Sequence, residues 1–275
     1  MPLNRLFNQA YNIPSIPKLV QELIDHFNDQ HSGTRDIAKK LQMDPGLAAK
    51  ALRLANSARY GAGRKINSID SAVIILGFDA LKTLVIASGL TSASKNIPAL
   101  DHNQFWRTAF SVAKIARILA KLARQDGEVA FTCGLLHNIG DTLLFLVHTN
   151  HMAHIAALAS ATGMSKSVLE QSQFGCTYME VGAELARRWK FPEEICQAIA
   201  NQERPENTNG DFTYPWLLNL ATRIYNALSS DESVEEAVGN IPPEHFANLN
   251  IDTNRLIDEL HYLQQQEDDI ESFLD

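Results

Sequence analysis

The chain has 275 residues, which allows one large domain or two modest ones, each with enough apolar side chains to form a core. Hydrophobic residues make up 45% and charged residues 20%, proportions that are ordinary for a globular protein and exclude an intrinsically disordered one. The formal net charge of −8 excludes a global positive field that would attract nucleic acid or anionic lipid.

The cysteines and the N-terminus favour a cytoplasmic protein. Cys133, Cys176 and Cys196 are far apart and form no CxxC pair, so we expect free thiols that pack as small hydrophobes, and no zinc site. The first residues contain no apolar run long enough for a signal peptide. No later stretch of about 18 residues looks apolar enough to span a bilayer, so no membrane segment is expected.

In chain order, apolar residues recur at intervals of three and four, which predicts helices throughout. Thr34 can cap a short helix that ends near Leu41. Asp44, followed by a proline, begins a helix to about Ala55, because a capping carboxylate and a proline at the first position both favour a helix start. Ser68 can cap the next helix, and Gly77 separates that helix from the one after it.

After the looser stretch at residues 91–103, a long helix is expected at 103–123 and another at 128–137. Thr177 and Glu180 have the spacing of a capping box, and Pro192 opens a further helix whose first residues are acidic. A polar loop at 201–213 precedes an apolar helix, and the rest of the chain is acidic and helical. The expected fold class is all-α, with two helical lobes.

Residues 34–56 resemble a helix-turn-helix that reads DNA. In such a motif the first residues of the second helix contact base edges. Here those residues are Pro45, Gly46, Leu47, Ala48 and Ala49, none of which has a side chain that forms hydrogen bonds. We therefore expect two packed helices, and a nucleic-acid-binding regulator remains an alternative.

Several segments together resemble the HDOD family (HD-related output domain), over residues 14–202. The segments, in chain order, are SIPKLVQEL, MDPGLAAKALRLANSARYG, INSIDSAVIILGFDAL, FWRTAFSVAKIARILA, GEVAFTCGLLHNIGDTLLF and MEVGAELARRWKFPEEICQAI. The resemblance implies a fold like that of HD-domain metal phosphohydrolases, and a role in bacterial signalling. It implies an N-terminal lobe at 1–97 and an HD-like lobe with acidic C-terminal helices at 98–275. The family-signature residues are expected to be structural, namely Asp44, Pro45, Asn56, Ser57, Gly61, Leu76, Gly77, Trp106, Gly182, Trp189 and Pro192.

The resemblance also locates the positions that hold metal ligands in working HD sites. The aligned residues are Thr108 on the long helix, the pair His137 and Asn138, Thr222 for the later aspartate, and Tyr178, Asn201 and Gln202 for additional histidines. Only His137 keeps its residue type. An asparagine lacks the negative charge with which carboxylates hold divalent cations, and threonine is a weak neutral ligand. We therefore expect no metal, no cofactor and no catalytic residue, with His137 either structural or lining a leftover pocket.

Two other groups of residues are ambiguous from the sequence alone. His148, His151 and His154 follow one another at intervals of three, which fits either two metal ligands or solvated imidazoles. Basic side chains on the long helix and near Trp189 fit either contacts to a ligand or partner, or solvated helix faces. The candidate contacts are Arg107, Lys114, Arg117, Arg187 and Arg188, and Lys121 and Arg124 continue the basic row on the long helix.

The sequence thus predicts a non-catalytic HDOD-type output or scaffold protein. It would act by binding a signalling protein or a small ligand, whose identity the sequence does not give. A metal-dependent phosphohydrolase or phosphodiesterase with an atypical site is the alternative from a different class. Self-association is left open.

Overall fold

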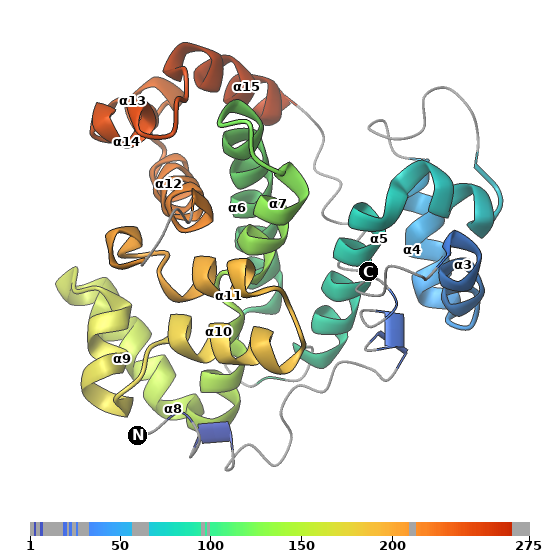
Figure 1. Ribbon diagram of the computed structural model, residues 1–275. Coiled ribbons are helices and arrows are strands. Elements are labelled where there is room, and N and C mark those ends of the chain that lie inside the picture. The colour runs from blue at the N-terminus through green and yellow to red at the C-terminus, as the bar shows by residue number, and fades with distance from the viewer. Residues whose placement is uncertain are drawn as a thin grey trace. The chain divides into compact units, whose positions relative to one another are not determined.

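The computed structural model describes residues 33–56, 66–94, 97, 100–208 and 213–265, together with residues 3, 6, 7, 19, 20, 22, 23 and 26. The described residues are helical or lie in turns, with no strand among them, so the protein is all-α (Figure 1). Contacts divide the chain into two units. Unit 1 contains Leu3, Leu6, Phe7 and the described residues from Ile97 onward, and unit 2 contains the described residues 19–94.

Unit 2 is built from α3 (Thr34–Gln42), α4 (Pro45–Ala55) and α5 (Ile69–Ser94), which pack on one another (Figure 1). The Asp44 carboxylate accepts hydrogen bonds from the backbone N–H groups of Gly46 and Leu47, as its place before a proline predicts. The expected cap at Thr34 is wrong. Gly33 occupies the N-cap position without a side-chain cap, and Thr34 is the first residue of α3.

Gly77 interrupts α5 where the sequence predicts a break. Its φ of +72° lies in the left-handed region, which residues with a Cβ atom rarely adopt, so the helix direction changes at this glycine. At the start of α5, Ser68 accepts a hydrogen bond from the Ser71 N–H at 3.2 Å, which confirms its capping role. Asn56 at the end of α4 donates to the Ile66 carbonyl and accepts from the Ile66 N–H, so it joins the two ends of the segment between α4 and α5.

Unit 1 begins with a hairpin of α6 (His102–Leu122) and α7 (Gly127–Leu136). The two helices approach so closely at Gly134 that a Cβ atom there would lie 2.4 Å from the Ala113 Cα. Asp126 caps α7 by accepting from two backbone N–H groups. This close backbone contact holds the last turn of α7, which His137 follows, against α6.

The remaining helices of unit 1 pack around this hairpin. They are α8 (Ile139–Thr162), α9 (Lys166–Phe174), α10 (Tyr178–Arg188), α11 (Glu193–Ala200), the 3-10 turn η1 (Pro205–Asn207), α12 (Thr213–Leu228), α13 (Val234–Gly239), α14 (Pro243–Ala247) and α15 (Thr253–Gln265). The predicted capping box of α10 is present, with Thr177 and Glu180 bonded reciprocally. α12 packs on α6, and α10 packs on both α8 and α11 (Figure 1).

The helices α8 and α10 cross at two glycines. A Cβ atom on Gly140 would lie 1.9 Å from the Tyr178 carbonyl oxygen and 2.6 Å from the Gly182 nitrogen. A Cβ on Gly182 would lie 3.2 Å from the Gly140 nitrogen. The start of α8, just after His137, is therefore held against the start of α10 by direct backbone contact.

One apolar stretch meets the length and hydropathy of a membrane span, which the sequence analysis did not expect. It runs from Gly127 to Thr162, across α7 and α8. In its most apolar window 89% of the residues are buried inside the protein, which is the environment of a core helix. Its apolar character is therefore accounted for by packing within unit 1.

Candidate functional site

His137 lies between the end of α7 and the start of α8, where its side chain is buried. Its Nδ1 atom is 2.7 Å from the Gly134 carbonyl oxygen, and since a carbonyl can only accept, Nδ1 carries the proton. Burial lowers the pKa of His137 from 6.5 to about 4, so the ring is neutral near pH 7. One ring nitrogen, Nε2, remains as an acceptor.

Asn138 follows as the N-cap residue of α8 but makes no side-chain cap hydrogen bond. The side chain is buried, and its Oδ1 has no hydrogen-bond partner in the described part of the chain. An amide in this position offers a carbonyl oxygen but no negative charge.

The two threonines at aligned ligand positions already use their hydroxyl groups. Thr108 in α6 forms a hydrogen bond of 2.9 Å with the Tyr225 hydroxyl of α12, so these helices are joined by a neutral contact. Thr222 in α12 donates to the Leu218 carbonyl of its own helix at 2.9 Å. Threonine hydroxyls in helices commonly donate to the preceding turn in this way, and a threonine hydroxyl is a weak ligand for a metal ion.

The amides after α11 serve as structural links. Gln202 is buried and donates from Nε2 to the His137 carbonyl at 2.8 Å. Asn219 in α12 donates to the Gln202 carbonyl at 2.6 Å. Asn201 donates to the Gln197 carbonyl, within the last turn of α11. The ends of α7 and α11 and the middle of α12 are thus connected by side-chain amides.

These residues do not fit a divalent metal ion. The aligned positions supply one imidazole nitrogen, amide oxygens and hydroxyl groups that are already bonded, and none of them supplies a carboxylate. Hard divalent cations are held largely by carboxylate oxygens. Over the described ranges, no group of three or more His, Cys, Asp or Glu side chains is arranged to hold a metal.

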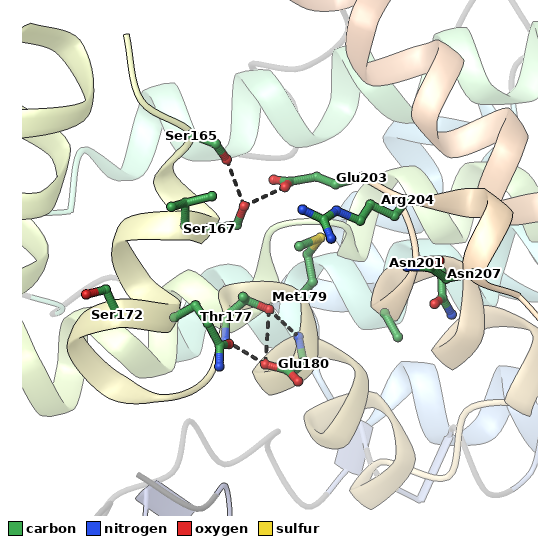
Figure 2. A pocket seen from close by; sticks show the side chains of 13 residues that line it. Ser165, Ser167, Ser172, Thr177, Met179, Glu180, Asn201, Glu203, Arg204 and Asn207 are labelled. Atoms are coloured by element: carbon green, nitrogen blue, oxygen red, sulfur yellow. Dashed lines mark hydrogen bonds between the residues drawn. The ribbon is translucent and has the colours of Figure 1, made fainter. Parts of the chain in front are cut away.

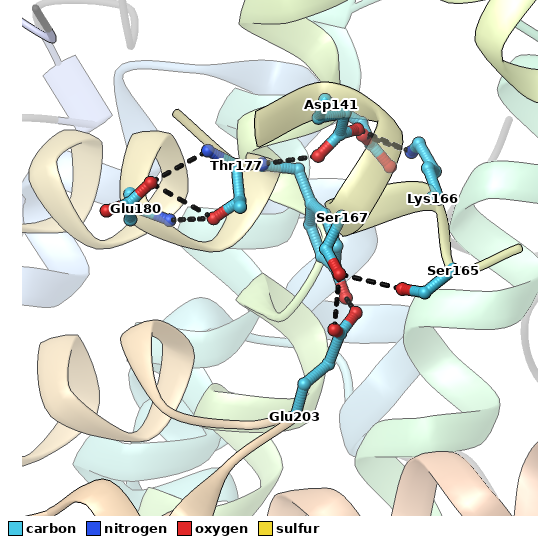
Figure 3. A network of polar contacts seen from close by, with 9 residues as sticks. Asp141, Ser165, Lys166, Ser167, Thr177, Glu180 and Glu203 are labelled. Atoms are coloured by element: carbon cyan, nitrogen blue, oxygen red, sulfur yellow. Dashed lines mark hydrogen bonds and ion pairs between the residues drawn. The ribbon is translucent and has the colours of Figure 1, made fainter. Parts of the chain in front are cut away.

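A lysine supplies the local positive charge instead. Lys166 in α9 donates to the carboxylate of Asp141, a residue one turn after His137 (Figure 3). The Lys166 Nζ also lies 3.6 Å from Glu170 Oε1. Burial alone would lower the pKa of Lys166, but attraction to Asp141 and Glu170 outweighs it and raises that pKa. The sequence analysis did not predict this cluster. Its only sign in the sequence is that Asp141 and Glu170 are single acids within helical segments that also carry apolar residues.

Glu170 is the least exposed member of the cluster, with a side chain that is 0% exposed. Its Oε2 accepts from the Tyr178 backbone N–H at 2.7 Å, at the first residue of α10. Burial raises the pKa of Glu170 to about 7, although Lys166 acts in the opposite direction. The centre of the Tyr178 ring lies 5.0 Å from Lys166 Nζ. The Tyr178 hydroxyl donates to Glu203 Oε1 at 3.3 Å.

Next to this cluster, a pocket of about 610 Å³ opens between α9, the start of α10 and the loop after α11 (Figure 2). Most of its lining residues are polar. The Ser167 hydroxyl of α9 donates to Glu203 in the loop after α11, and Glu180 accepts from the Thr177 N–H at the start of α10. Of the aligned positions, only Asn201 lines the pocket. His137 does not line this pocket.

Comparison with known proteins identifies the family. The HDOD domain matches residues 13–205. The chain belongs to the HDOD family. A crystal structure from Shewanella amazonensis SB2B, provisionally named a phosphohydrolase, is 31% identical, with a TM-score of 0.81 over 98% of each chain. A crystal structure from Marinobacter aquaeolei VT8, provisionally named a signal transduction protein, is 25% identical with a TM-score of 0.76, over 95% of this chain and 58% of that one.

A curated but uncharacterized relative comes from Treponema pallidum (strain Nichols). It is 27% identical over 192 residues, which is 68% of this chain and 37% of the relative. The chain thus spans little more than a third of the length of this curated relative.

The structure shows the surroundings of several HDOD signature residues. Trp106 is fully buried and donates to His102 Nε2 at 3.1 Å. Trp189 and Leu76 are buried, and Pro192 occupies the N-cap of α11. The signature positions 57 and 61 lie outside the described residues.

Among the basic residues, Arg117 matches neither alternative that the sequence offered, a ligand contact or a solvated helix face. Its side chain is buried, pairs with Glu128 at 2.6 Å and lies 3.8 Å from the centre of the Phe131 ring. This burial removes it from the surface row on α6, so it is not placed to contact a ligand or partner. Arg107 is exposed and Lys114 partly so.

The two arginines that precede Trp189, Arg187 and Arg188, are exposed, and each is paired with a glutamate. Arg187 forms two hydrogen bonds with Glu193. Arg188 pairs with Glu184, and its guanidinium lies 4.2 Å from the centre of the Phe7 ring. Arg188 and Phe7 thus form a cation–π contact.

The three histidines lie in the middle of α8. The helix kinks at His148, whose ring stacks on Phe174 with centroids 4.8 Å apart. His151 and His154 are exposed, as expected of solvated imidazoles, but His148 is partly buried. Burial lowers the pKa of His148, with His151 adding to the effect.

The cysteines of this HDOD protein are all free and buried, as the sequence predicts. Burial raises the pKa of the Cys196 thiol to about 11, so it stays protonated near pH 7.

Proposed function

We propose that this HDOD protein is a non-catalytic cytoplasmic signalling module that acts by binding another protein or a small ligand. The observation that carries the proposal is the state of the aligned ligand positions. They hold neutral side chains, and most of these side chains already make hydrogen bonds inside the protein. Without a bound cation no water is brought to a usable pKa, and no phosphoryl charge is neutralised.

The charge near His137 also supports this proposal. Lys166 forms an internal cluster with Asp141 and Glu170, in which the Asp141 carboxylate, one turn after His137, is already paired with a cation. A divalent cation would have to displace a lysine that is tied to Asp141. The name of the Marinobacter aquaeolei relative agrees with a signalling role.

Metal analysis combined with a hydrolysis assay tests the proposal. The full chain is purified without chelator, its Mg, Mn, Fe, Ni and Zn contents are measured, and it is assayed on a panel of phosphomonoesters and phosphodiesters with Mg²⁺ or Mn²⁺ added. An HD phosphohydrolase with a complete ligand set, prepared in the same way, serves as positive control. We expect substoichiometric metal and no turnover above background.

The contrary result is well defined. Stoichiometric metal, together with turnover that His137→Ala abolishes, would establish the phosphohydrolase alternative. Turnover that persists unchanged in His137→Ala would instead reveal a contaminant, and the non-catalytic proposal would stand.

A further inference from the structure

The pocket beside α9 is the strongest candidate for a ligand site that the HD comparison does not assign. Its volume of about 610 Å³ is in the range of small-molecule pockets. Ser172 of α9 lies on one side and Asn201 and Asn207 on the other (Figure 2), and Gln171 of α9 also lines the pocket. These side chains present both donors and acceptors to the pocket.

The two carboxylates that line the pocket are largely engaged by the protein. Glu203 accepts from the Ser167 hydroxyl at 2.5 Å and from the Tyr178 hydroxyl at 3.3 Å. Glu180 accepts through Oε2 from the N–H of Thr177 at 2.8 Å, within the capping box of α10. These contacts hold both acids in place, and each retains lone pairs for a hydroxyl donor from a ligand.

Arg204 is the basic residue of the lining, and its side chain is exposed. In the described part of the chain its guanidinium has no ion pair or hydrogen bond, although two carboxylates line the same pocket. Figure 2 shows the side chain directed toward Met179, inside the pocket. Five unused N–H donors in a planar fork match a carboxylate or a phosphate group.

We propose that this pocket binds a small polyhydroxylated anion, a sugar phosphate or a sugar acid, with its anionic group on Arg204. The ligand's hydroxyl groups donate to Glu203 and Glu180, and they exchange hydrogen bonds with the amides of Asn201, Asn207 and Gln171. A neutral polyol would leave the guanidinium without a counter-charge, and an apolar anion would leave the carboxylates without donors. Both parts of the ligand are therefore required.

Calorimetric titration of the full chain tests this proposal with three named probes at low salt. Glucose 6-phosphate and gluconate carry the two anionic groups, and glucose is the neutral reference. We expect saturable binding of at least one anion, and none of glucose over the same concentration range. Amide shifts in an NMR titration should locate the bound anion at residues 165–180 and 200–207.

Arg204→Gln should weaken binding of the anion roughly 10- to 100-fold, since it removes a charge-assisted hydrogen-bonded contact. Arg223→Gln is the matched control, because Arg223 is an exposed arginine of α12 outside the lining and loses the same charge. Circular dichroism confirms that both variants fold.

The proposal is overturned if neither anion binds, if glucose binds equally well, or if the two arginine variants weaken binding to the same extent. Those results would not affect the proposal that the protein is non-catalytic, because metal content and hydrolysis test that proposal separately.

Discussion

Gln202 donates from its side-chain amide to the backbone carbonyl of His137 at 2.8 Å, across 65 positions of sequence. The contact ties the loop after α11 to the end of α7, at a position where the family resemblance places a metal ligand. Its Nε2 also donates to the Ile199 carbonyl at 3.0 Å. An aligned ligand position has therefore become part of the hydrogen bonding that holds unit 1 together.

Replacing Gln202 with leucine should lower the free energy of unfolding of unit 1 by about 1–3 kcal/mol, because two buried carbonyls lose a donor. Urea unfolding followed by tryptophan fluorescence measures this, since all three tryptophans (Trp106, Trp189 and Trp216) lie in unit 1. Gln125→Ala, at an exposed glutamine after α6, should change the unfolding midpoint little. Equal effects of the two substitutions would show that the Gln202 link is dispensable.

The raised pKa of Glu170 predicts a distinctive pH dependence. Between about pH 4.5 and pH 7 the folded protein holds a proton on Glu170 that the unfolded chain releases. The contribution of Glu170 to stability is thus fully present below pH 4.5 and is lost as pH rises through about 7. His137 acts in the opposite direction because its pKa is lowered. Its contribution to stability is present above pH 6.5 and is lost as pH falls from 6.5 toward 4.

Glu170→Gln isolates the Glu170 contribution. The stability of the variant relative to the unsubstituted protein should rise as pH increases from 4.5 to 7, because the variant has no proton to lose. Urea unfolding at several pH values across this interval measures the difference. Glu206→Gln, at an exposed glutamate, should give a profile parallel to that of the unsubstituted protein. A parallel profile for Glu170→Gln as well would mean that Glu170 titrates normally.

Lys166→Met should destabilise unit 1 by about 3–5 kcal/mol, because it leaves the buried Asp141 carboxylate without its cation. Adding Asp141→Asn should recover part of this loss, since it removes the uncompensated charge. Lys121→Met removes an exposed lysine of α6 and should have little effect. If the double substitution is no more stable than Lys166→Met alone, the charge cluster is not what stabilises this region.

Gly140→Ala should destabilise unit 1 by about 3 kcal/mol or more, or prevent its folding. The added Cβ would lie 1.9 Å from the Tyr178 carbonyl oxygen, and backbone atoms can move away only if α8 and α10 separate. Gly239→Ala is the control, because a Cβ there meets no atom within 4 Å. Thermal unfolding compares the two, and similar midpoints would show that the helix crossing tolerates a wider spacing.

The local features of the fold were predictable because each depends on neighbouring residues. Asp44 before a proline, the pairing of Thr177 with Glu180, and the break at Gly77 are all set by interactions within a few positions. The same reasoning failed at Thr34, where several residues were compatible with the first turn and the chain used Gly33. Helix existence and capping therefore follow largely from the sequence.

The candidate site depended on contacts between distant segments. The sequence showed that the aligned positions lack carboxylates, but it did not show that Thr108 bonds to Tyr225 or that Gln202 bonds to His137. It also left Arg117 either as a contact to a ligand or partner or as part of a solvated face, whereas the packing of α6 on α7 buries it beside Glu128. Periodicity identifies which residues share a helix face, but the facing helix decides which of them are buried and paired. Charge and helix formation were thus determined by the sequence, and tertiary packing decided where each charge was neutralised.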